Sequence, residues 1–290
     1  MKVIPFTIPV RGEKSIILQE DNLPFFYNHL HRHKEIQITW IIKGEGSLLV
    51  SGNVHPFKPG MLFMIGANQP HIFKSDSRYF EKPRPGSCQS LTVFFDPMAQ
   101  QESLWNLPEM RKAKQWLEKF PTGCQLASPA SKKIIELLLS LKASKGIQQL
   151  TRFLEIISYL SSHPKELQTL SGADFLPSYT ETEGQRLNNI FQYTLQHYSE
   201  PIGLDQVAAL AHLTVPAFCR YFKNRTRKTF IQFLNEVRIN EACKMLANEQ
   251  LSISSIAYST GFSHTSSFIR TFKKLTGKPP LQYRKDQEEV

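Results

Sequence analysis

The sequence lacks a hydrophobic run long enough to cross a membrane, and it lacks paired cysteines. No apolar stretch approaches the roughly 18 residues that a transmembrane helix needs. The N-terminal stretch MKVIPFTIPVRGEK is interrupted by Pro5, Pro9 and Arg11, which is not the pattern of a signal peptide. The four cysteines are far apart and form no metal-binding or redox motif: Cys88, Cys124, Cys219 and Cys243. These absences predict a reduced, cytoplasmic protein without a membrane partner.

Acidic residues are scarce relative to basic ones. The chain has 25 Asp and Glu against 35 Lys and Arg, a net charge of +10, and a pI of about 9.4. This excess predicts an anionic partner, with nucleic acid favoured over a membrane surface. Residues 183–285 hold 14 basic and 6 acidic residues, which is +8 of the total. With 41% hydrophobic and 21% charged residues, the 290-residue chain has the composition of an ordinary globular protein of about two domains.

The pattern of the sequence changes along the chain. Residues 1–100 contain short runs of aromatic and β-branched residues between Pro and Gly turns, which is typical of a β-barrel or sandwich. Residues 101–170 carry apolar residues at helical spacing and predict a helical connector. Residues 171–184 show neither period and predict a linker, and residues 183–285 predict short helices. The predicted fold class is therefore α+β and multidomain: an N-terminal β-barrel, a helical connector and an all-α domain.

One motif occurs twice in the all-α region, over residues 207–223 and 256–273. Each copy has an apolar helix that contains an alanine, a tight turn, a polar cap (Thr214 or Ser263) and a second helix. The second helices carry the same residue types at matching positions: Phe218, Arg220, Phe222 and Lys223 in the first copy, and Phe268, Arg270, Phe272 and Lys273 in the second. Gly261 supplies an unusual backbone angle in the second turn. The pattern predicts two helix-turn-helix motifs with inward phenylalanines and outward arginines.

A single long helix is predicted between the copies, over residues 229–248. Roughly 18 helical residues span about 27 Å, and successive major-groove faces of DNA lie about 34 Å apart. A rigid helix of this length could hold two recognition helices one turn of DNA apart. The repeat, the spacer and the local positive charge together predict binding to double-stranded DNA.

These residues carry a resemblance to the DNA-binding domain of the AraC/XylS family of bacterial transcription regulators. The second copy is similar to the family throughout SISSIAYSTGFSHTSSFIRTFKKLTGKPPLQYR, and RINEACKML matches in the spacer. The first copy departs from it at Pro216, inside the recognition helix, and at Arg227, where the family usually has Gly. Pro216 is tolerable in the first turn of a helix.

The resemblance implies which residues face DNA. Base edges would meet Val215, Pro216, Cys219 and Arg220 in the first copy, and His264, Thr265, Ser266 and Arg270 in the second, with the caps Thr214 and Ser263 beside them. Arginine–guanine pairs are the commonest specific contact, and Thr or Pro can pack on a thymine methyl. Lys223, Lys273 and Lys274 are expected at phosphates or in solvent. For Arg238 a buried structural role is favoured over a DNA contact.

A second constellation lies in the N-terminal region. If Tyr27–Gly46 is a strand leading into a turn, His31, His33, Glu35 and Gln37 point to one face, and His71 follows from a later strand. This resembles the cupin pattern, in which two alternating histidines, a glutamate and a distant histidine meet inside a jelly-roll barrel. Gln37 occupies the glutamate position, and a neutral amide is a poor ligand for a hard divalent ion and cannot act as a general base.

Three interpretations of this constellation remain open. It is a catalytic or redox metal site, a small-molecule pocket, or a set of ordinary hydrogen bonds. The pocket is favoured, with the effector-binding residues His31, His33, Gln37, His71 and Trp40 and with no metal or other cofactor. The opposite face of the strand carries Ile36, Ile38, Trp40 and Ile42, and the sequence leaves open which face lines the barrel.

The predicted function is a cytoplasmic, sequence-specific transcriptional regulator that is not an enzyme and responds to a small-molecule effector such as a sugar or related metabolite. RNA polymerase is a further partner if the regulator activates. The alternative is a metal-dependent cupin enzyme with a helical appendage. An apolar stripe in the connector, formed by Ile134, Leu137, Leu138 and Leu141, predicts either a homodimer seam or packing under the barrel.

Overall fold

The computed structural model describes residues 4–5, 15–26, 29–50, 52–97, 103–170, 181–246 and 248–288. The chain divides into two compact units. The barrel unit consists of residues 3–51 and 55–178, and the helical unit consists mainly of residues 179–290. No helix among the described residues is long and apolar enough to cross a membrane.

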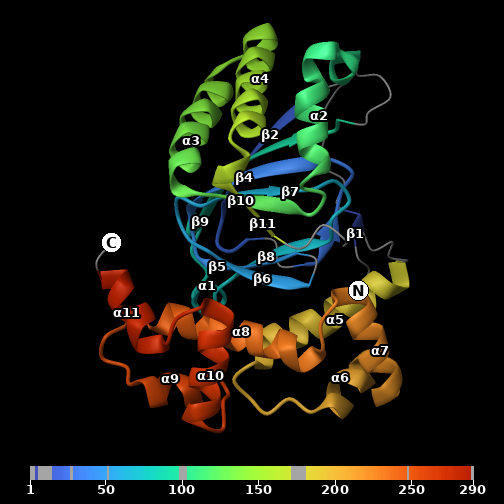
Figure 1. The fold of residues 1–290 in the computed structure, drawn as a ribbon. Coiled ribbons are helices and arrows are strands. Elements are labelled where there is room, and N and C mark those ends of the chain that lie inside the picture. The colour runs from blue at the N-terminus through green and yellow to red at the C-terminus, as the bar shows by residue number, and fades with distance from the viewer. Residues whose placement is uncertain are drawn as a thin grey trace. The chain divides into compact units, whose positions relative to one another are not determined.

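The barrel unit contains two β-sheets (Figure 1). The five-stranded sheet has the order β1 (Ile4–Pro5), β3 (His31–Arg32), β8 (His71–Ser75), β5 (Gly46–Val50) and β6 (Asn53–Phe57). The six-stranded sheet has the order β11 (Leu167–Thr169), β10 (Gly123–Leu126), β7 (Leu62–Ile65), β4 (Ile36–Lys43), β9 (Cys88–Phe95) and β2 (Ile16–Leu23). The predicted barrel is confirmed, but β10 and β11 come from the segment that the sequence predicted to be helical.

The histidine-rich stretch is not one strand, which corrects the sequence prediction. β3 ends at Arg32, a bend follows at Lys34 and Glu35, and β4 begins at Ile36. β3 belongs to the five-stranded sheet and β4 to the six-stranded sheet, so the bend carries the chain from one sheet to the other. Side chains on both sides of the bend can therefore face each other across the barrel interior.

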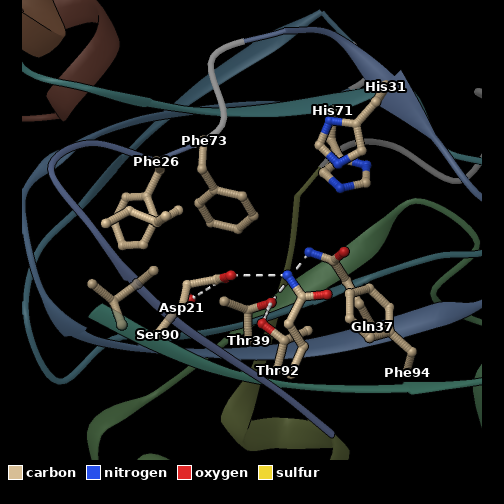
Figure 2. A pocket seen from close by; sticks show the side chains of 13 residues that line it. Asp21, Phe26, His31, Gln37, Thr39, His71, Phe73, Ser90, Thr92 and Phe94 are labelled. Carbon is tan, nitrogen blue, oxygen red and sulfur yellow. Dashed lines mark hydrogen bonds between the residues drawn. The ribbon is translucent and has the colours of Figure 1, made fainter. Parts of the chain in front are cut away.

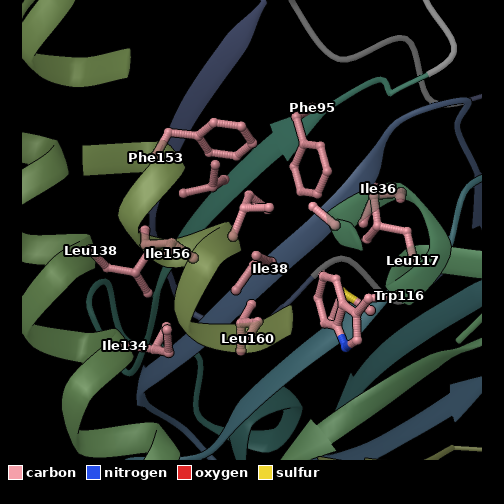
Figure 3. Packing of buried hydrophobic residues seen from close by; sticks show 14 of the residues in the cluster. Ile36, Ile38, Phe95, Trp116, Leu117, Ile134, Leu138, Phe153, Ile156 and Leu160 are labelled. Atoms are coloured by element: carbon pink, nitrogen blue, oxygen red, sulfur yellow. The ribbon is translucent and has the colours of Figure 1, made fainter. Parts of the chain in front are cut away.

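Three helices cover the outer face of the six-stranded sheet: α2 (Arg111–Glu118), α3 (Ser128–Ala143) and α4 (Gly146–Ser162) (Figures 1 and 3). Ile36 and Ile38 of β4 pack in one hydrophobic cluster with Leu138, Phe153 and Ile156 of these helices. Each such side chain contributes roughly 1.5–3 kcal/mol when it is fully buried.

The apolar stripe of the connector belongs to this layer. Ile134, Leu138 and Leu141 are fully buried at 0% exposure, and Leu137 packs against the same cluster. Packing on the barrel is therefore the correct alternative for the stripe, and its side chains are not available as a homodimer seam. The described part of the barrel unit also contains one short helix, α1 (Ser77–Glu81), and the 3-10 turns at Ser103–Asn106, Pro108–Met110 and Pro164–Glu166.

The helical unit consists of short helices, as the sequence predicted. They are α5 (Glu181–His197), α6 (Leu204–Leu210), α7 (Val215–Thr226), α8 (Phe230–Met245), α9 (Ile253–Ser259), α10 (Thr265–Thr276) and α11 (Pro280–Glu288). The predicted spacer helix is α8. Of the predicted linker, residues 171–180 lie outside the described residues, and residues 181–184 are the start of α5 rather than linker.

The internal repeat extends further than the two helix-turn-helix motifs. At the end of α7, Thr226 Oγ1 donates to the carbonyl of Phe222, and Thr276 at the end of α10 does the same to Phe272. An equivalent ion pair then joins the residue before the next helix to that helix in each copy. Lys228 pairs with Glu236 of α8, and Lys278 pairs with Asp286 of α11, both at 2.6 Å. The terminal helix α11 is therefore the counterpart of the first part of α8.

Candidate nucleic-acid interface and barrel cavity

The helices α7 and α10 bury and expose matching positions. Phe218 and Phe222 of α7, and Phe268 and Phe272 of α10, are 0% exposed. The opposite face of each helix is exposed at four positions with the spacing i, i+3, i+4, i+7: Pro216, Cys219, Arg220 and Lys223 in α7, and Ser266, Ile269, Arg270 and Lys273 in α10. Buried phenylalanines fix the rotation of each helix, so both present the same face to solvent.

The structure places the predicted DNA-facing residues on this surface. Val215 and Thr265 are half-buried and the other eleven are exposed: Thr214, Pro216, Cys219, Arg220, Lys223, Ser263, His264, Ser266, Arg270, Lys273 and Lys274. The sequence interpretation missed Ile269, which is 39% exposed. Its spacing of three residues from Ser266 was the signal that could have found it.

The predicted cap of the second recognition helix is corrected. The N-cap of α7 is Thr214, but the N-cap of α10 is His264 and not Ser263, and neither side chain makes a capping hydrogen bond. The equivalent backbone bonds Leu213 N–H to Ala208 and Phe262 N–H to Ala257, each 3.0 Å, fix the alignment of the two turns. The extra residue of the second copy therefore lies just before its cap.

Both turns need a left-handed residue at the same place. His212 has φ +52° in the first turn, and Gly261 has φ +87° in the second. A Cβ at position 261 would lie 2.6 Å from the carbonyl oxygen of Tyr198. Gly261 is therefore required by close approach as well as by its backbone angle.

Arg238 has the structural role that the sequence favoured. Its Nε donates to the carbonyl of Tyr198 at 2.8 Å, and its Nη2 donates to the carbonyl of Glu200 at 2.9 Å. The guanidinium also lies over the ring of Phe262. Arg238 therefore holds the segment before α6 against the second helix-turn-helix motif.

Inside the barrel unit, three imidazoles from different strands lie together. His31 of β3, His33 after it and His71 of β8 are all buried, and His31 pairs with His71 in the register of the two strands. The ring centroids of His31 and His71 are 4.3 Å apart, and those of His33 and His71 are 5.2 Å apart. The convergence predicted from the sequence is therefore present, and Figure 2 shows His31 and His71 side by side at the cavity, whose lining does not include His33.

Each of these rings is held by a backbone carbonyl. Nδ1 of His31, His33 and His71 lies 2.9, 2.9 and 2.7 Å from the carbonyl oxygens of His29, Glu35 and Gln69. Burial lowers the pKa of all three rings, to about 4 for His31 and well below the usual value for His71. The rings are therefore neutral at pH 7; His71 donates through Nδ1–H and keeps Nε2 as an acceptor.

Gln37 connects the imidazoles to a polar row on β4 and β9. Its side-chain amide contacts His33 Nε2 at 2.9 Å and Thr39 Oγ1 at 3.2 Å. Gln37 Oε1 is the atom beside His33 Nε2, and Gln37 Nε2 donates to Thr39 Oγ1, so the amide occupies the second nitrogen of His33. Thr39 Oγ1 is in turn 3.0 Å from Thr92 Oγ1.

These residues line a cavity between the two sheets (Figure 2). Its volume is about 80 Å³, which is room for a few water molecules or a small solute. The lining is Gln19, Asp21, Leu23, Phe26, His31, Gln37, Thr39, Ile41, His71, Phe73, Ser90, Thr92 and Phe94. A few polar groups converge on an otherwise apolar space, which is the usual form of a small-molecule site.

Trp40 does not line this cavity, which corrects its predicted role in effector binding. It packs with Ile36, Ile38 and Ile42 against the cluster under the helices. Gln37 and Thr39, which alternate with these residues along β4, face the cavity instead. The question of which face lines the barrel is therefore decided in favour of the polar face.

The three histidines are also the described residues that could hold a metal ion. One nitrogen from each ring lies within 4.8 Å of the other two. His71 Nε2 is buried without a hydrogen-bond partner. Three neutral imidazoles oriented through Nδ1–H form a donor set that suits zinc or a similar transition metal, so the residues fit such an ion.

Comparison with known proteins identifies both units. A family model for a helix-turn-helix domain matches residues 207–286, and a model for a cupin domain matches residues 26–78. The HTH-type transcriptional regulator YdeC of Bacillus subtilis (strain 168) is 27% identical over 290 residues, covering 96% of this chain and 92% of that protein. The HTH-type transcriptional activator RhaR of Mannheimia succiniciproducens is 25% identical over 263 residues, covering 88% of this chain and 86% of that protein.

The chain is therefore a transcriptional regulator with a helix-turn-helix DNA-binding domain and a cupin domain. The resemblance to the AraC/XylS family is confirmed by these matches and by a further relative, the activator RhaS of Escherichia coli O81, which is 21% identical over 279 residues and aligns over 96% of this chain and 94% of its own.

Proposed function

We propose that this regulator recognises specific sequences of double-stranded DNA through α7 and α10, and that a small molecule bound in the barrel cavity controls this recognition. The observation that carries the first part is the matched exposure of the two recognition helices. Arg220 and Arg270 occupy the same position on the exposed faces, where each can pair with a guanine in the major groove. Lys223 and Lys273 lie at the C-terminal end of that face, where a lysine can contact phosphates.

The spacer supports simultaneous binding by both motifs. α8 has 16 residues and is therefore about 24 Å long. Together with the turns at its ends, it can separate the two recognition helices by about the 34 Å that divides successive major-groove faces.

The second part of the proposal rests on the barrel cavity. His31, Gln37 and His71 converge on one space with apolar walls, and His71 Nε2 is a buried acceptor without a partner. An unsatisfied buried polar group costs about 1–3 kcal/mol, and a ligand that donates to it recovers that energy. An effector in this cavity is a small metabolite, for example a sugar or a related compound.

A binding-site selection with the full-length protein tests this function. Random duplex DNA is incubated with the protein, and bound sequences are amplified and compared. We expect an enriched motif with two half-sites about one helical turn apart. If the enriched sequences shared no motif, the exposed arginines would not determine the sequence specificity of DNA binding.

A second candidate function is a metal-dependent role for the barrel unit, as enzyme or as metal sensor. The three converging imidazoles and the unpartnered His71 Nε2 favour it, whereas Gln37 in place of a carboxylate does not. Metal analysis of protein purified without chelator separates the two candidates. Stoichiometric zinc or iron that is lost in a His71→Ala variant supports the metal role.

We also propose a cytoplasmic homodimer that contacts RNA polymerase when it activates transcription. The stripe under the barrel is buried, but Leu139 of α3 and Ile147 of α4 are 48% and 82% exposed. These outer positions, rather than the predicted stripe, are the apolar surface available to a second copy. Analytical ultracentrifugation of Leu139→Ser and Ile147→Ser variants tests this surface, and an unchanged dimer would place the interface elsewhere.

A further inference from the structure

The cavity contains a carboxylate that no lysine or arginine of the described residues neutralises. Asp21 of β2 is half-buried, and its two carboxylate oxygens accept from Gln19 Nε2 at 2.9 Å and from Ser90 Oγ at 2.8 Å. None of the ion pairs among the described residues includes Asp21, and none of the described lining residues is Lys or Arg. A carboxylate whose partners are neutral, in a space partly shielded from water, attracts a cation.

The other end of the cavity consists of acceptors. His71 Nε2 is buried without a hydrogen-bond partner among the described residues, and the ring of His31 lies beside it with a centroid distance of 4.3 Å. A ligand group that donates to His71 Nε2 from about 2.7–3.2 Å satisfies this acceptor. The histidine end therefore has the size and polarity to receive a group that donates hydrogen bonds.

Aromatic rings form the wall between these two ends. Phe26 lies on the side of Asp21 and Phe73 on the side of the histidines, and the centroids of the two rings are 6.5 Å apart (Figure 2). Phe94 closes the same space beside Gln37. Aromatic faces attract cations, more strongly when they are shielded from water, and they offer nothing to an anion.

From this charge and hydrogen-bond inventory we infer that the effector is a small protonated amine that carries a second N–H or O–H donor. Its ammonium group pairs with Asp21, and the second donor reaches His71 Nε2. Diamines, amino alcohols and amino sugars belong to this class. Carboxylates and phosphate esters are excluded, because the described lining offers them an aspartate and neutral acceptors but no cationic partner. This inference rests on the proposed function, since it names the ligand class of the same cavity.

The test compares amine, alcohol and acid forms of one carbon skeleton. The probes are putrescine, butanediol and succinate, and glucosamine, glucose and glucuronate. Melting of the full-length protein is followed through the fluorescence of Trp40, Trp105 and Trp116, which are the three tryptophans of the chain and all lie in the barrel unit. A ligand that binds only the folded state raises its melting temperature. We expect a rise with the amine of at least one skeleton and none with the matched alcohol or acid.

Two variants give the inference its control. Asp21→Asn keeps the shape and removes the charge, and amine affinity measured by calorimetry should fall about tenfold or more. Glu20→Gln removes the same charge one residue away on β2, where Glu20 pairs with Lys142 outside the cavity lining, and it should leave amine affinity unchanged. A loss of affinity in Asp21→Asn, with an unchanged melting temperature of the free variant and full affinity in Glu20→Gln, supports the assignment.

The other outcomes overturn it in distinguishable ways. Stabilisation by the acid or the alcohol of a skeleton as strong as by its amine refutes the amine class but leaves the cavity as an effector site. Stabilisation by zinc alone, lost in His71→Ala, refutes it in favour of a metal. No response to any probe or metal refutes it together with the proposed role of the cavity, while DNA binding by α7 and α10 is measured separately and is unaffected.

Discussion

At the scale of single residues, Arg227 occupies a backbone conformation that suits glycine. It ends α7 with φ +59°, where its counterpart Gly277 ends α10 with φ +81°. A non-glycine residue in this region costs about 1–2 kcal/mol, partly offset by the greater freedom of glycine in the unfolded chain. We expect Arg227→Gly to stabilise the helical unit by roughly 0.5–1 kcal/mol in denaturant unfolding followed by circular dichroism. Arg227→Ala removes the charge but keeps the strain, and equal stabilisation by both variants would contradict this explanation.

The buried histidines make a second prediction at this scale. The pKa of His31 is lowered to about 4 because the ring is buried, and the neighbouring His33 and His29 lower it further. The unfolded chain has a histidine pKa of about 6.5, so it takes up a proton at a higher pH than the folded protein does. Stability is therefore complete above pH 6.5 and is lost as the pH falls from there toward 4, by roughly 3 kcal/mol from His31 alone.

Urea unfolding of the barrel unit, followed by tryptophan fluorescence across this pH range, measures the loss. The side chains that face His31 and its neighbour His33 are His71, with its ring centroid 4.3 Å from that of His31, and Glu35, 3.8 Å from His33 Nδ1. His31→Gln should flatten the pH dependence between 6.5 and 4, whereas His163→Gln, at an exposed position, should not. An equal slope in wild type and His31→Gln would show that another group controls acid stability.

At the scale of elements, different positions on each recognition helix are expected to contribute to sequence specificity and to general DNA affinity. Arg270 lies at the centre of the exposed face of α10, and Lys273 lies at its C-terminal end. Arg270→Ala should relax the preference at defined base pairs and cost about 1–3 kcal/mol on the selected sequence. Lys273→Ala should weaken binding to all sequences alike and lower the salt dependence. A repeated binding-site selection with both variants checks this, and an unchanged motif for Arg270→Ala would refute its assignment to a base.

At the scale of the whole molecule, the two compact units predict that DNA binding needs only the second. Residues 183–285 contain both motifs, the spacer helix and +8 of the net charge. We expect this fragment to bind duplex DNA with an affinity that falls steeply as salt increases, because bound lysines and arginines release counterions from DNA. Fluorescence anisotropy at several salt concentrations measures it. A folded fragment without affinity at low salt would contradict the proposal.

Control by the cavity is also a property of the whole chain. His71→Ala removes a cavity acceptor far along the sequence from the recognition helices, and Gln69, which holds the ring through its carbonyl, is unchanged. The variant should keep its DNA affinity in the absence of effector but lose the response to it, because an effector acts only through its different affinities for two states of the protein. Reporter output with and without effector, beside thermal melts, tests this. Normal induction in a stable variant would place the effector site elsewhere.

The sequence by itself determined the helical unit. Paired phenylalanines four residues apart, a small residue in the first helix and Gly261 in the turn are local signals, because helix contacts join residues close in the chain. They predicted the duplicated motif, the spacer helix and the exposed faces of α7 and α10. The prediction was wrong at the second cap, where the inserted residue Ser263 precedes His264, and at the start of α5, and it missed Ile269.

The tertiary structure alone decided most of the barrel unit. Strand pairing joins residues far apart in sequence. Polar and apolar residues alternate along β4, and this pattern is the same whichever of the two faces points into the barrel. Ile36, Ile38 and Trp40 pack outward in the cluster with α3 and α4. Gln37 and Thr39 therefore face the cavity, together with Asp21 of β2 and Ser90 of β9. The convergence of His31, His33 and His71 was predicted from the sequence, but Asp21 was not, because only the register of β2 on β9 places its carboxylate in the same cavity.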